Sequence, residues 1–128
     1  MKILLDTHAF IWICTGNERL SSAARETILD SRSRLHLSVA SWWEMCVKIS
    51  IGKLGLHPRW STVFKREMQN NEIEWLPVRP EHCERVATLP FHHRDPFDRM
   101  LVAQALQEKM SILSADENLR AYNVKVLW

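Results

Sequence analysis

The sequence predicts one α/β domain in which a mainly parallel central sheet is covered by helices on both faces. The chain has 128 residues, which suits a single domain, and its 46% hydrophobic and 25% charged residues are typical of a globular fold with a packed core. Short apolar runs alternate along it with helical patterns. Strands that are separated by helices of this length are joined by right-handed crossovers and lie parallel.

Each expected strand is a short apolar run, and each expected helix fills the interval between two such runs. The strands are expected at 2–5 (KILL), 35–39 (LHLSV), 73–76 (IEWL), 111–114 (SILS) and 124–127 (VKVL). The helices are expected near 8–14, 21–31, 41–50, 59–70, 80–88 and 96–109. Residues that favour helix starts support three of them. Asp6 can cap the first helix, Ser41 the third, and Asp95, which is followed by Pro96, the last.

The composition excludes several classes of protein. No apolar run approaches the ~20 residues that cross a bilayer, and Asp6 interrupts the apolar start too early for a signal peptide. Cys14, Cys46 and Cys83 are odd in number and set among apolar residues. We therefore expect reduced core thiols in a cytoplasmic protein, and neither a disulfide set nor a zinc site. The net charge of +2 permits binding to nucleic acid without predicting it.

Acidic residues stand at positions where α/β proteins bind ligands. Asp6 and Asp116 each follow a strand, and Asp98 opens a helix after a crossover. Taken singly, each has a structural explanation, because acids at helix starts act as caps and suit the helix dipole. The carboxyl ends of parallel strands share one edge of the sheet, however, so these acids are expected to converge there. Carboxylates gathered in a cleft repel one another, and a bound cation is the usual reason for such a cluster.

Helical geometry separates the roles of the two aspartates in the stretch Asp-Pro-Phe-Asp. At about 100° per residue, Asp98 falls near the middle of an apolar arc that includes Leu101, whereas Gln104 lies on the opposite, polar side. An inward carboxylate needs a partner, which makes Asp98 a candidate site residue. Asp95 fits the N-cap position and is expected to support the site rather than to act as one of its main ligands.

Glu44 is the fourth candidate acid. It lies at the capping-box position relative to Ser41, and Lys48 is four residues further on, the favourable orientation for a helix ion pair. On a surface such a pair would contribute only ~0.3–0.5 kcal/mol. The helix near 41–50 is apolar on nearly every side, because it also carries Trp42 and Trp43. We therefore expect Glu44 to be buried in a tryptophan-rich wall, where a surface ion pair does not account for it.

Four motifs in this order resemble the PIN-domain ribonucleases, and most closely the VapC-like toxins of bacterial type II toxin–antitoxin pairs. The motifs are ILLDTH, SWWEMCVKISIGKL, HRDPFDRMLVAQA and ILSADENLRAY, and together they span essentially the whole chain. Each motif is weak by itself, but four in the right order across one domain of the right length are specific. The resemblance implies a three-layer PIN-like sandwich over residues 1–128 and hydrolysis of RNA with Mg²⁺ (or Mn²⁺).

The resemblance also implies a role for individual residues. The acids that match the family's metal-binding and catalytic positions are Asp6, Glu44, Asp98 and Asp116. The residues expected to support them or to contact the substrate are Thr7, Lys48, Asp95, Arg99 and Ser114. Among these, Arg99 directly follows Asp98 and is expected to contact phosphate or to restrain a carboxylate.

Two other interpretations of function remain open. The acids could serve only as caps and ion pairs in a non-catalytic binding module, or the same site could belong to a metal-dependent nuclease that acts on DNA or flap structures. Ligation of a metal by histidine is not expected, because the six histidines lack ligand spacing. His92 or His93 is more plausible as a contact to the substrate, since both directly precede the acid-bearing helix.

The expected partners are an RNA substrate, a cognate antitoxin and a second copy of the chain. Association with a membrane is not expected. The homodimer and hetero-oligomers with the antitoxin follow from the resemblance alone. The number of tryptophans exceeds what the core of a domain of this size usually holds, and the candidates for a surface role are Trp12, Trp42, Trp43 and Trp60. We therefore predict an apolar, tryptophan-bearing groove beside the acids, between the helices near 8–14 and 41–50. An amphipathic segment of the antitoxin would occupy it, with a basic residue reaching the carboxylates.

Overall fold

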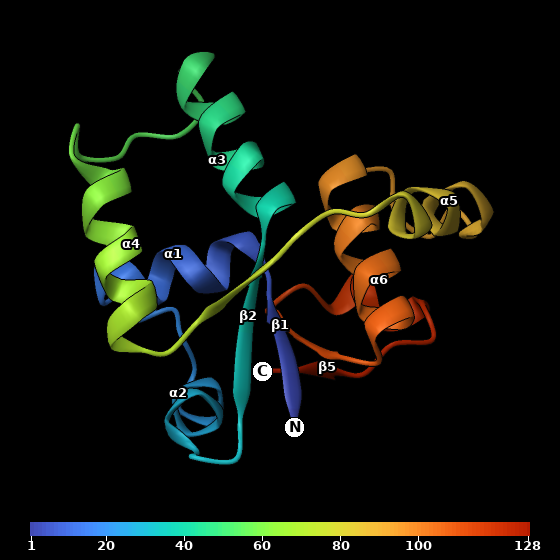
Figure 1. Ribbon diagram of the computed structural model, residues 1–128, viewed down its shortest axis with the longest axis horizontal. Coiled ribbons are helices and arrows are strands. Elements are labelled where there is room, and N and C mark those ends of the chain that lie inside the picture. The colour runs from blue at the N-terminus through green and yellow to red at the C-terminus, as the bar shows by residue number, and fades with distance from the viewer.

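A computed structural model of residues 1–128 shows six α-helices around a five-stranded sheet (Figure 1). The strands are β1 (Lys2–Leu5), β2 (Arg34–Ser38), β3 (Glu74–Leu76), β4 (Ser111–Leu113) and β5 (Val126–Leu127). The helices are α1 (Thr7–Thr15), α2 (Ser22–Leu29), α3 (Val39–Ser50), α4 (Trp60–Asn70), α5 (Pro80–Thr88) and α6 (Pro96–Glu108), and a 3₁₀ helix, η1 (Glu117–Ala121), follows β4. The predicted α/β class is confirmed, and each predicted element is present.

The sheet is parallel throughout, with the strand order β3-β2-β1-β4-β5. Leu5 at the end of β1 pairs with Leu37 of β2 on one side and with Leu113 of β4 on the other. The chain builds outward from β1 to β3 and then crosses to β4 on the opposite side of β1. The strand order thus reverses between β1 and β4. Open parallel sheets bind ligands at the carboxyl ends of the strands at such a point.

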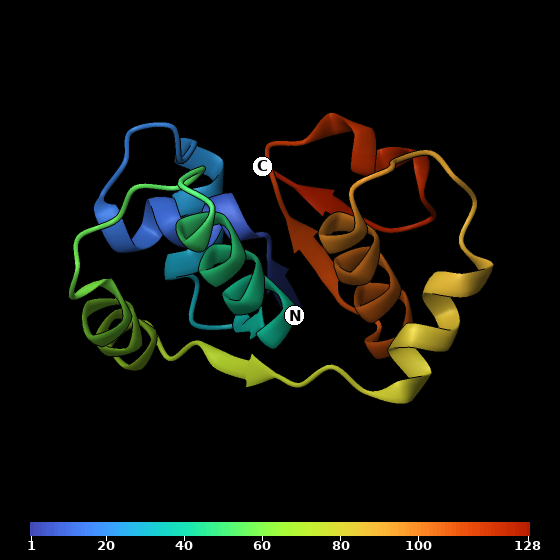
Figure 2. The same ribbon diagram turned by 90° about the horizontal axis from the view of Figure 1, so that it is seen from above.

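Two apolar layers, one on each face of the sheet, hold the helices in place. Along β1, Ile3 and Leu5 face a cluster that contains Phe10 of α1, whereas Leu4 faces a second cluster that contains Leu101 of α6. Figure 2 shows α1, α2 and α4 on one side of the sheet and α5 and α6 on the other. These are the three layers that the sequence predicts. None of the helices is both long and apolar enough to span a membrane.

Helix α3 begins earlier than predicted and is less buried. Its N-cap is Ser38, whose Oγ accepts a hydrogen bond from the backbone N–H of Ala40 at 3.0 Å, so β2 passes directly into the helix. Ser41 is therefore inside the helix, and its buried hydroxyl has no hydrogen-bond partner. Glu44 falls in the middle of the helix and not at a capping position. Figure 1 shows that α3 extends past the carboxyl edge of the sheet. Trp43 on this helix is 61% exposed.

The cysteines are free thiols, as predicted, but only one of them is even partly buried. Cys14 packs against the cluster around Phe10, where burial raises its pKa to about 12. Cys46 and Cys83 are exposed, so the prediction that they are core residues is wrong. Cys46 lies on α3 and Cys83 on α5.

Candidate functional site

A polar cleft of about 120 Å³ lies at the carboxyl ends of β1 and β4, where the strand order reverses. All of its lining residues are polar or charged. They are Asp6, Thr7, His8, Glu44, Lys48, Asp95, Asp98 and Asp116. The four acids that sequence reasoning singled out therefore line one cleft, although they come from four segments of the chain. Five carboxylates and a single ammonium group line the cleft. Carboxylate oxygens are the ligands that a hard divalent cation prefers.

Asp6 is fixed at the end of β1 by hydrogen bonds to both of its carboxylate oxygens. Its Oδ1 accepts from the backbone N–H of Ala9 at 2.7 Å, which makes it the N-cap of α1, and its Oδ2 accepts from the hydroxyl of Ser114. The side chain is 7% exposed. Burial raises the pKa of Asp6, and the hydrogen bond from Ser114 and that from Ala9 counteract this increase. Asp6 therefore serves both as a cap and as a cleft residue.

Glu44 reaches the cleft from α3 and is held by two neighbours. Thr7 donates its hydroxyl to Oε1 at 2.6 Å, and the ammonium of Lys48 lies 2.5 Å from Oε2. Glu44 is only 3% exposed, as predicted for an acid inside an apolar helix wall. Burial would lower the pKa of Lys48, but the hydrogen bond and charge of Glu44, together with Asp95 and Asp98, raise it overall. Lys48 thus stays charged and offsets part of the negative charge of the cleft.

The two aspartates at the start of α6 differ in what their side chains contact, and the N-cap role predicted for Asp95 is confirmed. Asp95 is the N-cap, because its Oδ1 accepts from the backbone N–H groups of Phe97 at 2.8 Å and of Asp98 at 3.2 Å. Both aspartates line the cleft, and Asp98 takes no part in the cap. Burial and the neighbouring charge of Asp95 raise the pKa of Asp98 to about 7. A cation bound among these carboxylates would offset much of the free-energy cost of keeping Asp98 ionised there.

His93 lies between two of the acids. Its Nε2 is 3.3 Å from Oδ2 of Asp98 and 3.3 Å from Oδ2 of Asp116. The three side chains bring their ligand atoms within 4.8 Å of one another. Sequence reasoning considered His93 only as a contact to the substrate and did not place it in this cluster. The available signal was its position two residues before the cap Asp95, which brings its ring to the same helix start.

The expectation that Arg99 contacts phosphate or restrains a carboxylate is wrong. Arg99 is 5% exposed and donates to the backbone carbonyls of Val86, Leu89 and Pro90, at 3.1, 3.3 and 2.8 Å. It also donates to the hydroxyl of Tyr122 at 3.2 Å. Successive helix residues point about 100° apart, so Arg99 faces the loop before α6 when Asp98 faces the cleft. Arg99 holds that loop in place.

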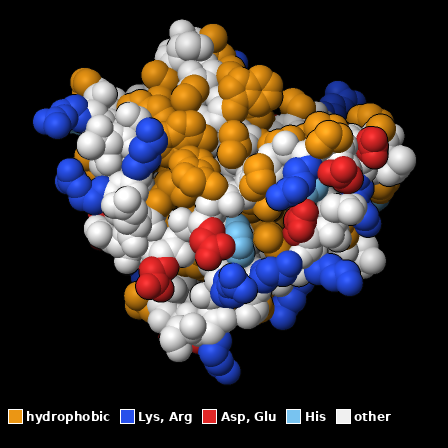
Figure 3. Space-filling model, in the orientation of Figure 1, with side chains coloured by type: hydrophobic (Ala, Val, Ile, Leu, Met, Phe, Trp, Pro, Cys, Tyr) orange, Lys and Arg blue, Asp and Glu red, His pale blue; other side chains and the backbone are white.

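The predicted groove between α1 and α3 is absent, because most of the tryptophans pack against one another. Trp12 contacts Trp128 with ring centres 5.7 Å apart, and Trp42 contacts Trp60 and Trp75 at 4.8 and 5.2 Å. Figure 3 shows hydrophobic side chains gathered over α3 and its neighbours.

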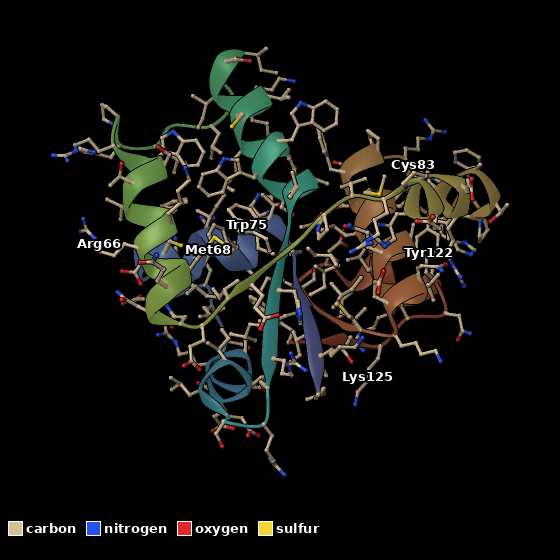
Figure 4. The ribbon with its side chains drawn as sticks, viewed as in Figure 1. Arg66, Met68, Trp75, Cys83, Tyr122 and Lys125 are labelled. Atoms are coloured by element: carbon tan, nitrogen blue, oxygen red, sulfur yellow. The ribbon has the colours of Figure 1, made fainter.

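An apolar groove exists instead between α3, α5 and α6, with a volume of about 490 Å³. Its lining residues are Val39, Ala40, Trp43, Val78, Cys83, Val86, Pro96, Phe97 and Met100. Trp43 and Phe97 meet edge to face at 5.3 Å. Cys83 lies where α5 approaches α6 (Figure 4). Trp43 directly precedes Glu44 on α3 and Phe97 directly precedes Asp98 on α6, so the same two helices carry residues of the groove and of the acidic cleft. Of the four tryptophans, only Trp43 lines it.

A larger hollow of about 720 Å³ lies at the amino ends of β2 and β3 and does not gather unpaired acids. Asp30 there pairs with Arg32 at 2.8 Å. Glu74 lies 3.8 Å from Arg34 and 3.5 Å from the His36 ring. Its charges are thus largely matched, and the carboxyl edge of the sheet remains the better candidate for chemistry.

Comparison with known proteins identifies the family. The sequence profile of the PIN domain matches residues 3–125. The chain belongs to the PIN-domain family. The five-stranded parallel sheet and its flanking helices are the architecture that this family implies, so the predicted fold is confirmed at the level of the family as well as the class.

Individual relatives of this PIN domain come from several bacteria. The chain is 24% identical to Ribonuclease VapC22 of Mycobacterium tuberculosis, in an alignment that covers 94% of this chain and 91% of the relative. Its fold matches VapBC2 from Rickettsia felis, solved bound to a promoter DNA fragment, with a TM-score of 0.74, 10% identity and coverage of 98% and 97% of the two chains. It also matches a toxin–antitoxin complex from Klebsiella pneumoniae, with a TM-score of 0.63, 15% identity and coverage of 98% and 96%.

Proposed function

We propose that this PIN domain, formed by residues 1–128, is a cytoplasmic endoribonuclease toxin that depends on Mg²⁺ or Mn²⁺ and is inhibited by a cognate antitoxin. The observation that carries the proposal is the convergence of Asp6, Glu44, Asp98 and Asp116 in one cleft at the point where the strand order reverses. The relative named as a ribonuclease supports the reaction, and the fold match to a toxin–antitoxin complex supports the partner.

The cleft residues fit a divalent ion. Their donors are carboxylate oxygens, which Mg²⁺ and Mn²⁺ prefer, and burial and the charge of Asp95 raise the pKa of Asp98 to about 7. Asp6, Glu44, Asp98 and Asp116 are the residues that would hold the ion. When bound, it supplies Lewis-acid chemistry, lowering the pKa of a water and neutralising charge on the phosphodiester.

The protein's own residues prepare the cleft for this chemistry. The hydroxyl of Ser114 and the N–H of Ala9 fix the Asp6 carboxylate, and Thr7 and Lys48 fix that of Glu44. Prealigned ligands reduce the cost of reorganisation when substrate arrives. Lys48 is 31% exposed and provides the only ammonium at the cleft, so it also reduces repulsion of a phosphate backbone.

The groove between α3, α5 and α6 is the proposed antitoxin site. Val39, Trp43 and Val78 are 44%, 61% and 37% exposed, which leaves an unusual amount of apolar surface uncovered. The helices α3 and α6, which line the groove, also carry Glu44 and Asp98 of the cleft, so an amphipathic segment with a basic residue is the complementary occupant. A homodimer through a separate helical face, and hetero-oligomers with the antitoxin, complete the proposed assembly.

RNA cleavage by purified protein tests the proposal. Matched RNA and DNA oligonucleotides are incubated with Mg²⁺, Mn²⁺ or a chelator. We expect cleavage of RNA only with an ion, and a loss in Asp98→Asn beyond the roughly 10–100-fold typical of groups that support a metal ligand. Glu117→Gln is the matched control, because that carboxylate pairs with Arg120 outside the cleft. Cleavage of DNA alone would favour the DNA nuclease, and folded protein that cleaves neither would favour a non-catalytic module.

A further inference from the structure

His93 lies beside the acids of the cleft, in a position that contacts on both sides of its ring define. Its Nδ1 lies 3.0 Å from the backbone nitrogen of Asp95, and its Nε2 is 3.3 Å from Oδ2 of both Asp98 and Asp116. The side chain is 20% exposed. A ring held at both nitrogens has one orientation, so its protonation pattern follows from its neighbours.

The backbone N–H of Asp95 fixes the tautomer of His93. A backbone N–H can only donate, so Nδ1 of His93 must accept and therefore carries no hydrogen. In the neutral ring the hydrogen is then on Nε2, which hydrogen-bonds Oδ2 of Asp116 and lies at the same distance, 3.3 Å, from Oδ2 of Asp98. Ligation of a metal through Nε2 would require a hydrogen on Nδ1, facing the N–H of Asp95. That arrangement would set two donors against each other and lose a hydrogen bond.

The main chain at His93 is also anchored. The hydroxyl of Tyr122 accepts from the backbone N–H of His93 at 3.0 Å and from Arg99 at 3.2 Å. Arg99 in turn holds the carbonyls of Leu89 and Pro90. The buried Arg99 and Tyr122 thus fix the loop that presents the ring of His93 to the acids.

We propose that His93 is a positioning residue, which donates from Nε2 to Asp98 and Asp116 and orients these two carboxylates for the divalent ion without binding the ion itself. The proposal rests on the function proposed above. Asp98 comes from the start of α6 and Asp116 from the loop after β4, so no backbone element links the two carboxylates. A shared donor supplies that link. Hydrogen bonds to ligating carboxylates typically change metal affinity 10–100-fold.

A comparison of Mg²⁺ and Mn²⁺ separates this role from direct ligation. Mg²⁺ and Mn²⁺ both accept carboxylate oxygens, whereas a nitrogen ligand favours Mn²⁺ much more than Mg²⁺. Loss of a hydrogen-bond donor to the carboxylates should therefore reduce the affinity for both ions by a similar factor. Loss of a ligand nitrogen should reduce the affinity for Mn²⁺ far more than that for Mg²⁺.

His57 provides a matched control elsewhere in the chain. Its Nδ1 accepts from the backbone N–H of Arg59 at 3.1 Å, the same local arrangement as between His93 and Asp95, but His57 does not line the cleft. Substitution of His57 removes the same type of local hydrogen bond without touching an acid of the site.

The experiment measures Mg²⁺ and Mn²⁺ affinity by calorimetry for the wild type, His93→Ala, His93→Gln and His57→Ala, with the tautomer of His93 followed by ¹⁵N NMR. We expect His93→Ala to reduce the affinity for both ions about tenfold. His93→Gln should recover part of this loss through its amide donor, and His57→Ala should bind both ions as the wild type does. Nδ1 of His93 should remain an acceptor after Mg²⁺ is added.

A much larger loss for Mn²⁺ than for Mg²⁺, or unchanged affinity for both in a folded His93→Ala protein, would overturn the positioning role while leaving the proposed function intact. A wild type that binds neither ion would overturn the proposed function and this inference with it.

Discussion

Replacement of Asp98 by Asn should stabilise the metal-free protein at alkaline pH. Burial and the charge of Asp95 raise the pKa of Asp98 from its ordinary value of 3.8 to about 7. A carboxyl whose pKa is higher in the folded state stabilises the fold below its unfolded pKa, and this stabilisation is lost as pH rises through 7. Asp98→Asn removes the ionisation but keeps the shape, so its advantage should grow between pH 5 and pH 8.

The size of the effect follows from the shift. At 1.36 kcal/mol per pKa unit, a shift of this size corresponds to about 4 kcal/mol. A quarter of the Asp98 side chain is open to solvent, with 25% exposure, and screening reduces the effect. We therefore expect Asp98→Asn to unfold with a free energy about 2 kcal/mol higher than the wild type at pH 8 in chelator, with roughly a third of that difference already present at pH 5, because the loss begins at the unfolded pKa of 3.8.

Added Mg²⁺ should make the wild type more stable than Asp98→Asn, the reverse of the order expected in chelator. An ion at a hundred times its dissociation constant stabilises the wild type by about 2.7 kcal/mol, and Asp98→Asn should gain much less because it lacks a ligand. Urea denaturation at pH 5 and pH 8, with chelator or with Mg²⁺, measures all of these differences. A mutant less stable than the wild type at pH 8 in chelator would refute the proposed repulsion, and equal gains from Mg²⁺ would refute the proposed ligand role.

Three further substitutions test the cap, the loop anchor and the groove. Asp95→Ala removes the N-cap of α6 and should cost about 0.5–2 kcal/mol of stability while reducing RNA cleavage only partly, as chemical denaturation and a cleavage assay will show. Arg99→Lys cannot reach all the carbonyls that the guanidinium holds, so thermal melts should show a loss of at least about 2 kcal/mol and not wild-type stability. Trp43→Ser should weaken the antitoxin complex by at least about 2 kcal/mol, or roughly 30-fold, in a pull-down titration with the cognate antitoxin. Ile51→Ser, an equally exposed apolar site on the same segment but outside the groove, should leave that complex unchanged.

The fold and the convergence of the acids were predictable because both depend on local patterns. Alternating apolar runs identified each strand, and parallel topology brings the ends of β1 and β4 to one edge. The geometry of one helix start then separated Asp95, which caps, from Asp98, which faces the cleft. Neither the fold nor this distinction depends on knowing which side chains from distant parts of the sequence pack together.

The buried polar residues of α6 were not predictable, because their partners are distant in the sequence. Helical periodicity placed Gln104 on the polar side of α6, yet it is fully buried because α5 packs over that side. Its Nε2 donates to the carbonyl of Pro77 at 3.2 Å. Arg99 likewise satisfies backbone carbonyls of the preceding loop. A backbone carbonyl has no sequence signature, so a buried polar residue that binds one resembles a surface residue in the sequence.

The bond from Ser114 to Asp6 shows the same limit within the site. The two residues are 108 positions apart, and a hydroxyl after a strand is equally consistent with a capping box. In the structure the cap of η1 is Asp116, and Oγ of Ser114 accepts from the backbone N–H of Asp116 at 3.0 Å while its hydroxyl donates to Asp6. Only the pairing of β1 with β4 brings these side chains together.

Anomalous diffraction from crystals soaked in Mn²⁺ tests most directly whether the four acids form a metal site. Data collected at the manganese absorption edge locate bound ions independently of any assumption about the ligands. We predict an anomalous peak in the cleft, bounded by Asp6, Glu44, Asp98 and Asp116, in the wild type, and a strongly reduced peak in Asp98→Asn. A cleft without a peak at millimolar Mn²⁺, with the same side chains ordered, would contradict the assignment.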